Sequence, residues 1–117
     1  MTIDDLQKLC TKHKGVTQDI KWGHHLCFNV GGKMFLILSP DEVPINASFK
    51  VSDEEFPELS EQTGFKPAPY SARYKWVGLD DIKRLSKKKW EYYIEQSYRL
   101  VHEKLPMKMK KSIEALK

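Results

Sequence analysis

The chain has 117 residues, 40% of them hydrophobic and 31% charged, which suits one globular domain with a single core and excludes a disordered polymer. Its longest apolar run, from Met34 to Leu38, is far too short for a membrane helix, and its two cysteines form no Cys-x-x-Cys motif, so the sequence predicts a cytoplasmic protein with reduced thiols. The net charge of +4 is uneven, because residues 1–71 carry 7 basic and 10 acidic side chains whereas residues 72–117 carry 13 and 6.

The first predicted element is a helix over about residues 3–13. Thr2 and Asp5 have the spacing of a capping box, in which a hydroxyl and a carboxylate satisfy N–H groups at a helix start, and apolar residues then recur at helical spacing. Gly15 suits the left-handed residue that ends many helices. A short strand is predicted next, over 20–22.

The clearest local signal is a β-hairpin over 26–38. Two apolar runs are joined by Gly31 and Gly32, and both positions of such a turn need a positive φ, which glycine adopts without steric cost. We therefore expect these glycines to form the turn. Phe28 and the segment 34–38 are expected to contribute to the core.

Two strands and a short helix are predicted in the middle of the chain. Apolar and polar residues alternate over 43–51, which predicts a strand with one solvated face. Ser52 begins a second capping box and predicts a short helix over 52–62. The segment 63–69, which is rich in proline, is expected to be a loop, and 70–79 a strand with aromatic residues on one face.

The main helix has an apolar stripe that repeats every three or four residues over four turns, and Pro106 ends it. The sequence offers two starting points for this main helix: Ser86 is one candidate for the N-cap, and Asp80 or Asp81 is the alternative. The remaining segment, 107–117, is predicted to be a marginal amphipathic segment in which apolar residues alternate with lysines.

Several motifs occur together in a fixed order. They are Trp22-Gly-His24, Phe28-x-Val-Gly-Gly-Lys-Met-Phe35, Lys50, Pro67-Ala-Pro-Tyr70, Trp76 and Ser97-Tyr-x-Leu-Val101. With the motifs in this order and spacing, the chain resembles the MmcQ/YjbR family of small bacterial proteins. The resemblance predicts a single domain over residues 1–117. The resemblance implies an α+β fold, similar to frataxin and secretion chaperones, in which an antiparallel sheet of about five strands has helices packed on one side, with an N-terminal helix and a long C-terminal helix. The family is labelled DNA-binding-like on the basis of its fold, and it offers no catalytic residues to carry over.

Two motifs suggest ligand sites but have simpler explanations. Gly31-Gly-Lys33 lacks the spacing and the following helix of a phosphate-binding loop, so a hairpin turn is expected there. His24, His25 and Cys27 are potential zinc ligands, yet neighbouring residues of a strand point to opposite faces, and the two that share a face do not close a site. We therefore predict no metal and no cofactor.

Ser97 and six aromatic residues could each have a functional role or a place in the core. Ser97 lies on the apolar stripe of the main helix, so we expect a core hydroxyl bonded to the carbonyl four residues earlier and not a nucleophile. Six aromatic side chains are candidates either for the core, which their periodicity favours, or for a platform that stacks nucleic-acid bases. They are Trp22, Tyr70, Tyr74, Trp76, Trp90 and Tyr98.

The cationic segment from Lys83 to Lys89 departs most from ordinary patterning. If Ser86 is the N-cap, three lysines occupy a first helical turn that disfavours each of them by roughly 0.3–1 kcal/mol, and a bound anion would relieve this. Alternatively, the long lysine stems reach water at little cost, or the helix begins near Asp81. The predicted anion or nucleic-acid site consists of Arg84, Ser86, Lys87 and Lys88.

The sequence favours a non-enzymatic intracellular binding module whose basic C-terminal half contacts nucleic acid weakly, through electrostatic attraction. The alternative is a protein-interaction or chaperone-like module, in which the sheet face or the segment 70–76 docks a partner and the charge serves solubility. Salt dependence distinguishes the two, because phosphate contacts weaken steeply with ionic strength whereas apolar docking hardly changes. No membrane association is predicted.

Overall fold

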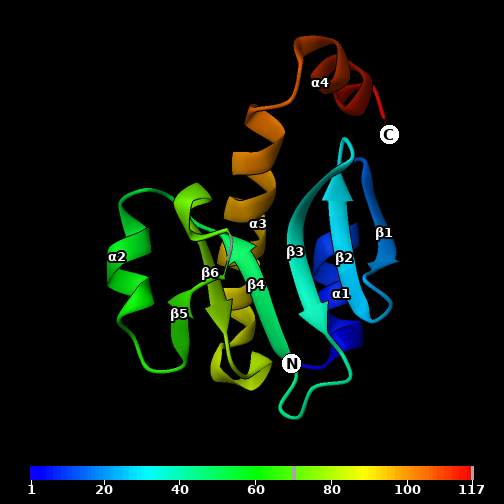
Figure 1. The fold of residues 1–117 in the computed structure, drawn as a ribbon. Coiled ribbons are helices and arrows are strands. Elements are labelled where there is room, and N and C mark those ends of the chain that lie inside the picture. Colours follow the sequence, from blue (N-terminus) through cyan, green and yellow to red (C-terminus); the bar gives the residue numbers. More distant parts are fainter. Residues whose placement is uncertain (70, 117) are drawn as a thin grey trace.

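The computed structural model describes residues 1–69 and 71–116, and within them six strands form an antiparallel sheet in the order β1-β2-β3-β4-β6-β5 (Figure 1). The strands are β1 (Val16–Lys21), β2 (His25–Val30), β3 (Lys33–Ser39), β4 (Asn46–Lys50), β5 (Phe65–Pro67) and β6 (Trp76–Leu79). The helices are α1 (Ile3–Thr11), α2 (Glu55–Ser60), α3 (Lys87–Glu103) and α4 (Met107–Glu114), with short 3-10 turns η1 (Ala72–Tyr74) and η2 (Ile82–Arg84). The predicted α+β class is confirmed, with an N-terminal helix, the long helix α3 and six strands where about five were expected.

The β2–β3 hairpin is the predicted one. Gly31 and Gly32 connect the strands with φ angles of 58° and 79°, which are positive as the turn requires. Phe28 is buried, and so are three of the five residues in the segment 34–38. The other two, Met34 and Ile37, are only half-buried, so the expected core contribution holds for most of the hairpin and not for all of it.

The core lies between one face of the sheet and the helices α1 and α3. A row of buried side chains crosses four strands of this face: Phe28, Leu36, Phe49 and Val77. Trp90 on α3 packs edge-on against Phe49, with ring centroids 5.6 Å apart, and its indole N–H donates to a carbonyl of η2 at 2.9 Å. Figure 1 shows α1 and α3 on the same side of the sheet, as predicted, which leaves the opposite face uncovered.

Several predicted strand boundaries were wrong. The strand expected over 20–22 is longer and begins at Val16, whereas the one expected over 43–51 is reduced to β4. In the predicted strand 70–79 only β6 is extended, after the turn η1, and Tyr70 lies outside the described residues. The expected loop 63–69 contains β5, which pairs with β6. A strand of three residues shows no periodicity, so only the pairing reveals it.

The helices α1 and α3 begin at residues that the sequence offered as caps, whereas α2 has Glu54 and not the predicted Ser52 as its N-cap. Thr2 caps α1 in a complete capping box: its hydroxyl accepts from the N–H of Asp5 at 3.2 Å, and its own N–H donates to the Asp5 carboxylate at 2.9 Å. Helix α1 ends at Thr11, two residues before the predicted end at residue 13. Helix α2 occupies only the middle of the helix predicted over 52–62. Ser86 is the N-cap of α3.

The last helix covers the tip of the β2–β3 hairpin. The segment 107–117, expected to be marginal, forms α4 as far as residue 114, and Lys117 lies outside the described residues. A Cβ atom at Gly31 would lie 2.6 Å from both Leu105 Cδ1 and Met109 Sδ, so this segment rests directly on the turn (Figure 1). Among the described residues, no helix is both long and apolar enough to cross a membrane.

The two edges of the sheet differ. At one edge β5 has three residues, includes Pro67 and contacts α2. At the other edge β1 has six residues, of which four are exposed, and no described strand pairs with its outer side. The open edge of the sheet is therefore β1.

Candidate functional site

The face of the sheet opposite to α1 and α3 carries a groove of about 750 Å³. Its floor is built from side chains that alternate with core residues along β3, β4 and β6. Ile37, Ser48 and Gly78 stand opposite one another in these three strands. A serine and a glycine at the centre of a sheet leave the backbone close to the surface, so they hollow this face. The volume lies in the range of sites that bind small molecules or peptide side chains.

Apolar side chains form the rim of this groove. Trp76 lies on β6, two residues before Gly78, whereas Trp22 lies in the β1–β2 turn, at the opposite end of the strand rows. Val43 and Pro44, in the loop that follows β3, also line the groove, and Val43 is 97% exposed. The groove therefore has a tryptophan at each end and a small, partly polar floor between them.

Trp22 has a backbone conformation that bulky residues rarely adopt. Its φ is 51°, in the left-handed region, and Gly23 follows with φ 80°. The N–H of His24 donates to the carbonyl of Lys21 at 3.3 Å and closes the turn. Trp22 is 64% exposed, and its ring meets that of His25 edge-on, with centroids 5.7 Å apart. The left-handed conformation costs about 1–2 kcal/mol, and core packing does not offset this cost.

The charged side chains around the groove nearly cancel. Lys66 lies beside Gly78, where a Cβ atom would be 3.7 Å from Lys66 Cγ. Glu42 and Asp80 contribute two carboxylates. The Arg84 guanidinium donates to Asp80 and lowers the pKa of that carboxyl group, so this charge is already paired. The groove is therefore close to neutral.

The predicted anion site lies at the start of α3. The Ser86 hydroxyl accepts from the N–H of Lys89 at 3.3 Å, so the helix begins where the anion hypothesis required. The alternative start near Asp81 is wrong. That carboxylate instead accepts from the N–H of Lys83 at 2.9 Å and caps the short turn η2.

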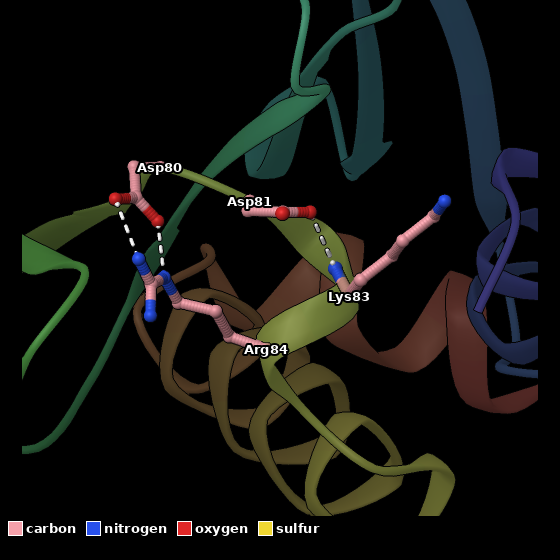
Figure 2. A network of polar contacts seen from close by, with 4 residues as sticks. All are labelled: Asp80, Asp81, Lys83 and Arg84. Atoms are coloured by element: carbon pink, nitrogen blue, oxygen red, sulfur yellow. Dashed lines mark hydrogen bonds and ion pairs between the residues drawn. The ribbon is translucent and has the colours of Figure 1, made fainter.

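Arg84 differs from the other predicted residues because it is already paired. Its guanidinium donates to the two carboxylate oxygens of Asp80 at 2.5 and 3.2 Å (Figure 2). It also lies over Gly64, where a Cβ atom would be 2.3 Å from Arg84 Cδ. Lys87 and Lys88 are exposed. The structure thus brings the four predicted residues together, with Ser86 engaged in the cap, Arg84 in an ion pair, and the two lysines facing solvent.

A second cationic surface lies at the other end of α3. Because α4 packs over the hairpin tip and over Gly15, its lysines come close to those after α1, and Lys14 Nζ donates to the carbonyl of Glu114 at 3.4 Å. We name this region by the lysines that its contacting segments carry, which are Lys12, Lys14, Lys33, Lys104, Lys108, Lys110 and Lys111. Since α3 has 17 residues, its two ends, where these cationic surfaces lie, are about 24 Å apart. The sequence assigned the positive charge to the C-terminal half as a whole and missed this division.

Lys50, one of the motif residues, is 9% exposed. Its Nζ donates to the carbonyl of Tyr74 and ties the end of β4 to η1. Burial lowers the pKa of this ammonium group, and the nearby Lys104 acts in the same direction. Lys50 does not line the groove, and its contacts indicate a structural role.

The other residues considered from the sequence take different places. Within the described residues no group of three or more His, Cys, Asp or Glu side chains lies close enough to hold a metal. Trp90 is fully buried and Trp76 largely so, whereas Trp22 and Tyr74 are exposed, so these four side chains form no common platform. Ser97 is buried as predicted, but its hydroxyl donates to the carbonyl of Phe35 on β3 and not to the carbonyl four residues earlier, because the strands separate there.

A protein-family model described as YjbR matches residues 11–100. The chain belongs to the YjbR family. Its fold is similar to that of the Deinococcus radiodurans protein DR2400, described with the domain DUF419, with a TM-score of 0.86 and 21% identity over 97% of this chain and 88% of that one. A Pseudomonas syringae protein matches with a TM-score of 0.70 and 20% identity over 86% of this chain and 99% of that one. No curated protein matches the chain.

In this YjbR-family protein, three of the motifs that carry the resemblance contribute residues to the groove. Trp22, Pro69 and Trp76 come from three separate segments of the chain, and all line it. The floor residues Ser48 and Gly78 were not singled out from the sequence. The only signal for Ser48 was the alternation over 43–51, which puts it on the solvated face.

Proposed function

We propose that this YjbR-family protein is a non-enzymatic binding module that docks a segment of a partner protein in the groove on the open sheet face. The observation that carries the proposal is the exposed apolar rim beside a hollow floor: Trp22 is 64% exposed and Val43 is 97% exposed. Tryptophan is enriched among the residues that dominate protein interfaces, and charged residues are depleted at interface centres. A polypeptide segment supplies both an apolar side chain for the rim and backbone polar groups for the floor.

The electrostatics of the groove favour such a segment over a polyanion. Lys66 is opposed by Glu42 and Asp80, so the groove holds no surplus of cations to neutralise phosphates. The strained turn at Trp22 supports the proposal as well. An exposed tryptophan that gains little from packing in the isolated chain gains it when a partner covers the ring.

Peptides selected from a display library on the purified protein provide a defined probe. Ser48→Phe fills the floor, because Ser48 faces Ile37 and Gly78, and we expect it to weaken the selected peptides by more than about tenfold, or about 1.4 kcal/mol. Thr17→Phe makes the same kind of change on the same face of the sheet but outside the groove, so it serves as the control. Circular dichroism checks that both variants fold.

The location of the bound peptide decides the outcome. In ¹⁵N NMR spectra, shift changes are expected at groove residues such as Gly78 and Ser39 and at the Trp22 indole. Peptides that bind the Ser48→Phe variant as tightly as the wild-type protein, or that shift only signals elsewhere, would rule out the groove as the docking site.

A second candidate function is contact with nucleic acid through the basic C-terminal half. It rests on the charge of residues 72–117, whose 13 basic and 6 acidic side chains give +7, and on the two cationic surfaces at the ends of α3. An extended phosphate backbone is long enough to reach from one surface to the other, since about seven nucleotides of a duplex strand span 24 Å. Arg84 contributes less to such contact than the lysines do, because Asp80 already pairs with it.

The salt dependence of binding tests this candidate with a labelled 20-mer duplex and the corresponding single strand. The double variant Lys87→Ala/Lys88→Ala should weaken binding to all sequences alike and lower the slope of log affinity against log salt by about 1 for each lost phosphate contact. Lys108→Ala/Lys111→Ala tests the second surface in the same way, and Ser48→Phe should have no effect. Absence of binding at low salt, or identical slopes for both double variants and the wild type, rules out this candidate.

A further inference from the structure

The open edge strand β1 carries charges in a self-complementary order. Asp19 and Lys21 are two residues apart on one face, and 3.3 Å separates Lys21 Nζ from Asp19 Oδ2. The Asn29 side chain donates to Asp19 at 3.1 Å and orients its carboxylate. Ile20, between the two charges, points to the other face and is 58% exposed. The strand therefore presents an acid, an exposed apolar residue and a base in succession.

This edge lacks several of the features that usually prevent strand pairing. Proteins protect edge strands with proline, bulges, short length, charged side chains or a covering helix. Strand β1 is not short and has neither proline nor a bulge, but it does carry the charges of Asp19 and Lys21. The opposite edge has two of these features, because β5 is only three residues long and contains Pro67. By contrast β1 has six residues without proline, pairs with β2 in a regular register, and has four exposed residues. Its outward N–H and C=O groups are therefore suited to pairing with another strand.

We propose that two copies of this chain associate through antiparallel pairing of their β1 strands, centred on Ile20. In this register Asp19 of each copy stands opposite Lys21 of the other copy, and the two Ile20 side chains face each other. A register centred on Asp19 or on Lys21 would place like charges directly opposite, which is unfavourable. Among the registers centred on these three residues, the charge order therefore favours the one centred on Ile20, in which a second copy of the chain supplies the complementary charges.

The symmetry of this pairing has a structural consequence. Residues that face each other across an antiparallel pair lie on the same side of the sheet, so the two copies are related by a two-fold axis perpendicular to it. The pairing gives a continuous sheet of twelve strands, twice the six of one chain, and sets both grooves on the same face. The association does not depend on the groove having the proposed function.

The pairing is short, so reversible association at high protein concentration is expected. Sedimentation equilibrium over a wide concentration range measures it for the wild type and for two single variants. Asp19→Lys places two lysines on the strand, and Lys21→Asp places two aspartates on it. Each variant alone should remain monomeric because like charges then meet.

An equimolar mixture of Asp19→Lys and Lys21→Asp should form a heterodimer, because lysines of one chain then face aspartates of the other. The double variant Asp19→Lys/Lys21→Asp should associate with itself as the wild type does, which separates the pairing from any folding defect of a single variant. Lys88→Asp, which changes the net charge far from β1, is the control and should associate normally. A wild-type protein that stays monomeric at every concentration, or a mixture that associates no more than its components, would overturn the proposal.

Discussion

The hydroxyl of Ser97, on α3, accepts a hydrogen bond from the backbone N–H of Lys50 at the end of β4, over 3.1 Å. The same hydroxyl donates to the carbonyl of Phe35 on β3 over 2.5 Å. The β3–β4 ladder has its last pair at Leu36 and Phe49, so Phe35 and Lys50 would be the next partners. Figure 1 shows the two strands diverging in front of α3. The helix therefore supplies the hydrogen bonds that the separated strands no longer make with each other.

Replacing Ser97 by alanine should destabilise the protein by about 2–4 kcal/mol, because two buried backbone groups lose their partner at about 1–3 kcal/mol each. Urea unfolding followed by circular dichroism measures this. Ser112→Ala is the matched control, since the Ser112 hydroxyl donates to a helix carbonyl at 3.1 Å on the exposed surface, and its loss should cost less than about 0.5 kcal/mol. Equal stabilities for the two variants would show that Ser97 does not bridge the strands.

The two turn glycines should respond differently to alanine. Both have positive φ, so either substitution costs about 1–2 kcal/mol in backbone strain. A Cβ atom at Gly32 meets nothing within 4 Å, whereas one at Gly31 would lie 2.6 Å from Leu105 and Met109. Gly31→Ala should therefore cost about 1–3 kcal/mol more than Gly32→Ala and should increase amide hydrogen exchange in α4. Equal losses in the two variants would contradict the packing of α4 on the turn.

Trp22→Asn should separate stability from binding. Asparagine adopts the left-handed conformation more readily than tryptophan, and Asn-Gly is a favoured pair in this kind of turn. The free energy of unfolding should therefore stay the same or rise by up to about 1 kcal/mol, while groove-binding peptides lose affinity. Calorimetry and peptide titration measure the two effects. A loss of stability greater than about 1 kcal/mol would instead assign Trp22 a role in folding.

The stability of the protein should decrease in mild acid because of His13. Its ring stacks on Tyr98 with centroids 4.8 Å apart, and its Nε2 atom is buried without a hydrogen-bond partner among the described residues. Burial lowers the pKa of His13 from the ordinary 6.5, Lys12 acts in the same direction, and Glu95 opposes both. The unfolded chain therefore binds this proton more readily than the folded protein. The free energy of unfolding should be insensitive to His13 above about pH 7 and should fall as the pH drops through about 6.5.

Urea unfolding at about pH 7.5 and about pH 5.5 measures the contribution of His13. His13→Gln should lose less stability between these two values than the wild type does. His24→Gln removes a histidine from an exposed turn and serves as the control. An equal decrease in all three proteins would assign the acid sensitivity to other groups.

Features that depend only on neighbouring residues were predictable from the sequence. The hairpin at Gly31 and Gly32 and the capping box of Thr2 and Asp5 were predicted, and the structure confirms them. The sequence left two candidate starts for α3, and the structure selects Ser86 as the N-cap. Each of these features is a hydrogen bond or a backbone angle set within about four residues, so its cause is visible in a short stretch of chain. The family resemblance was predicted from motifs in the same way.

Tertiary structure alone decided the features that join distant segments. It pairs β5 with β6, places Ser97 between two separated strands, divides the cations between the two ends of α3, and brings Trp22 and Trp76 into one groove. The residues next to a serine on an apolar helix stripe, or next to a tryptophan that precedes a glycine, do not reveal which distant groups its side chain will contact. Which groups it meets depends on strand register and helix packing, and these follow from burying the whole core at once.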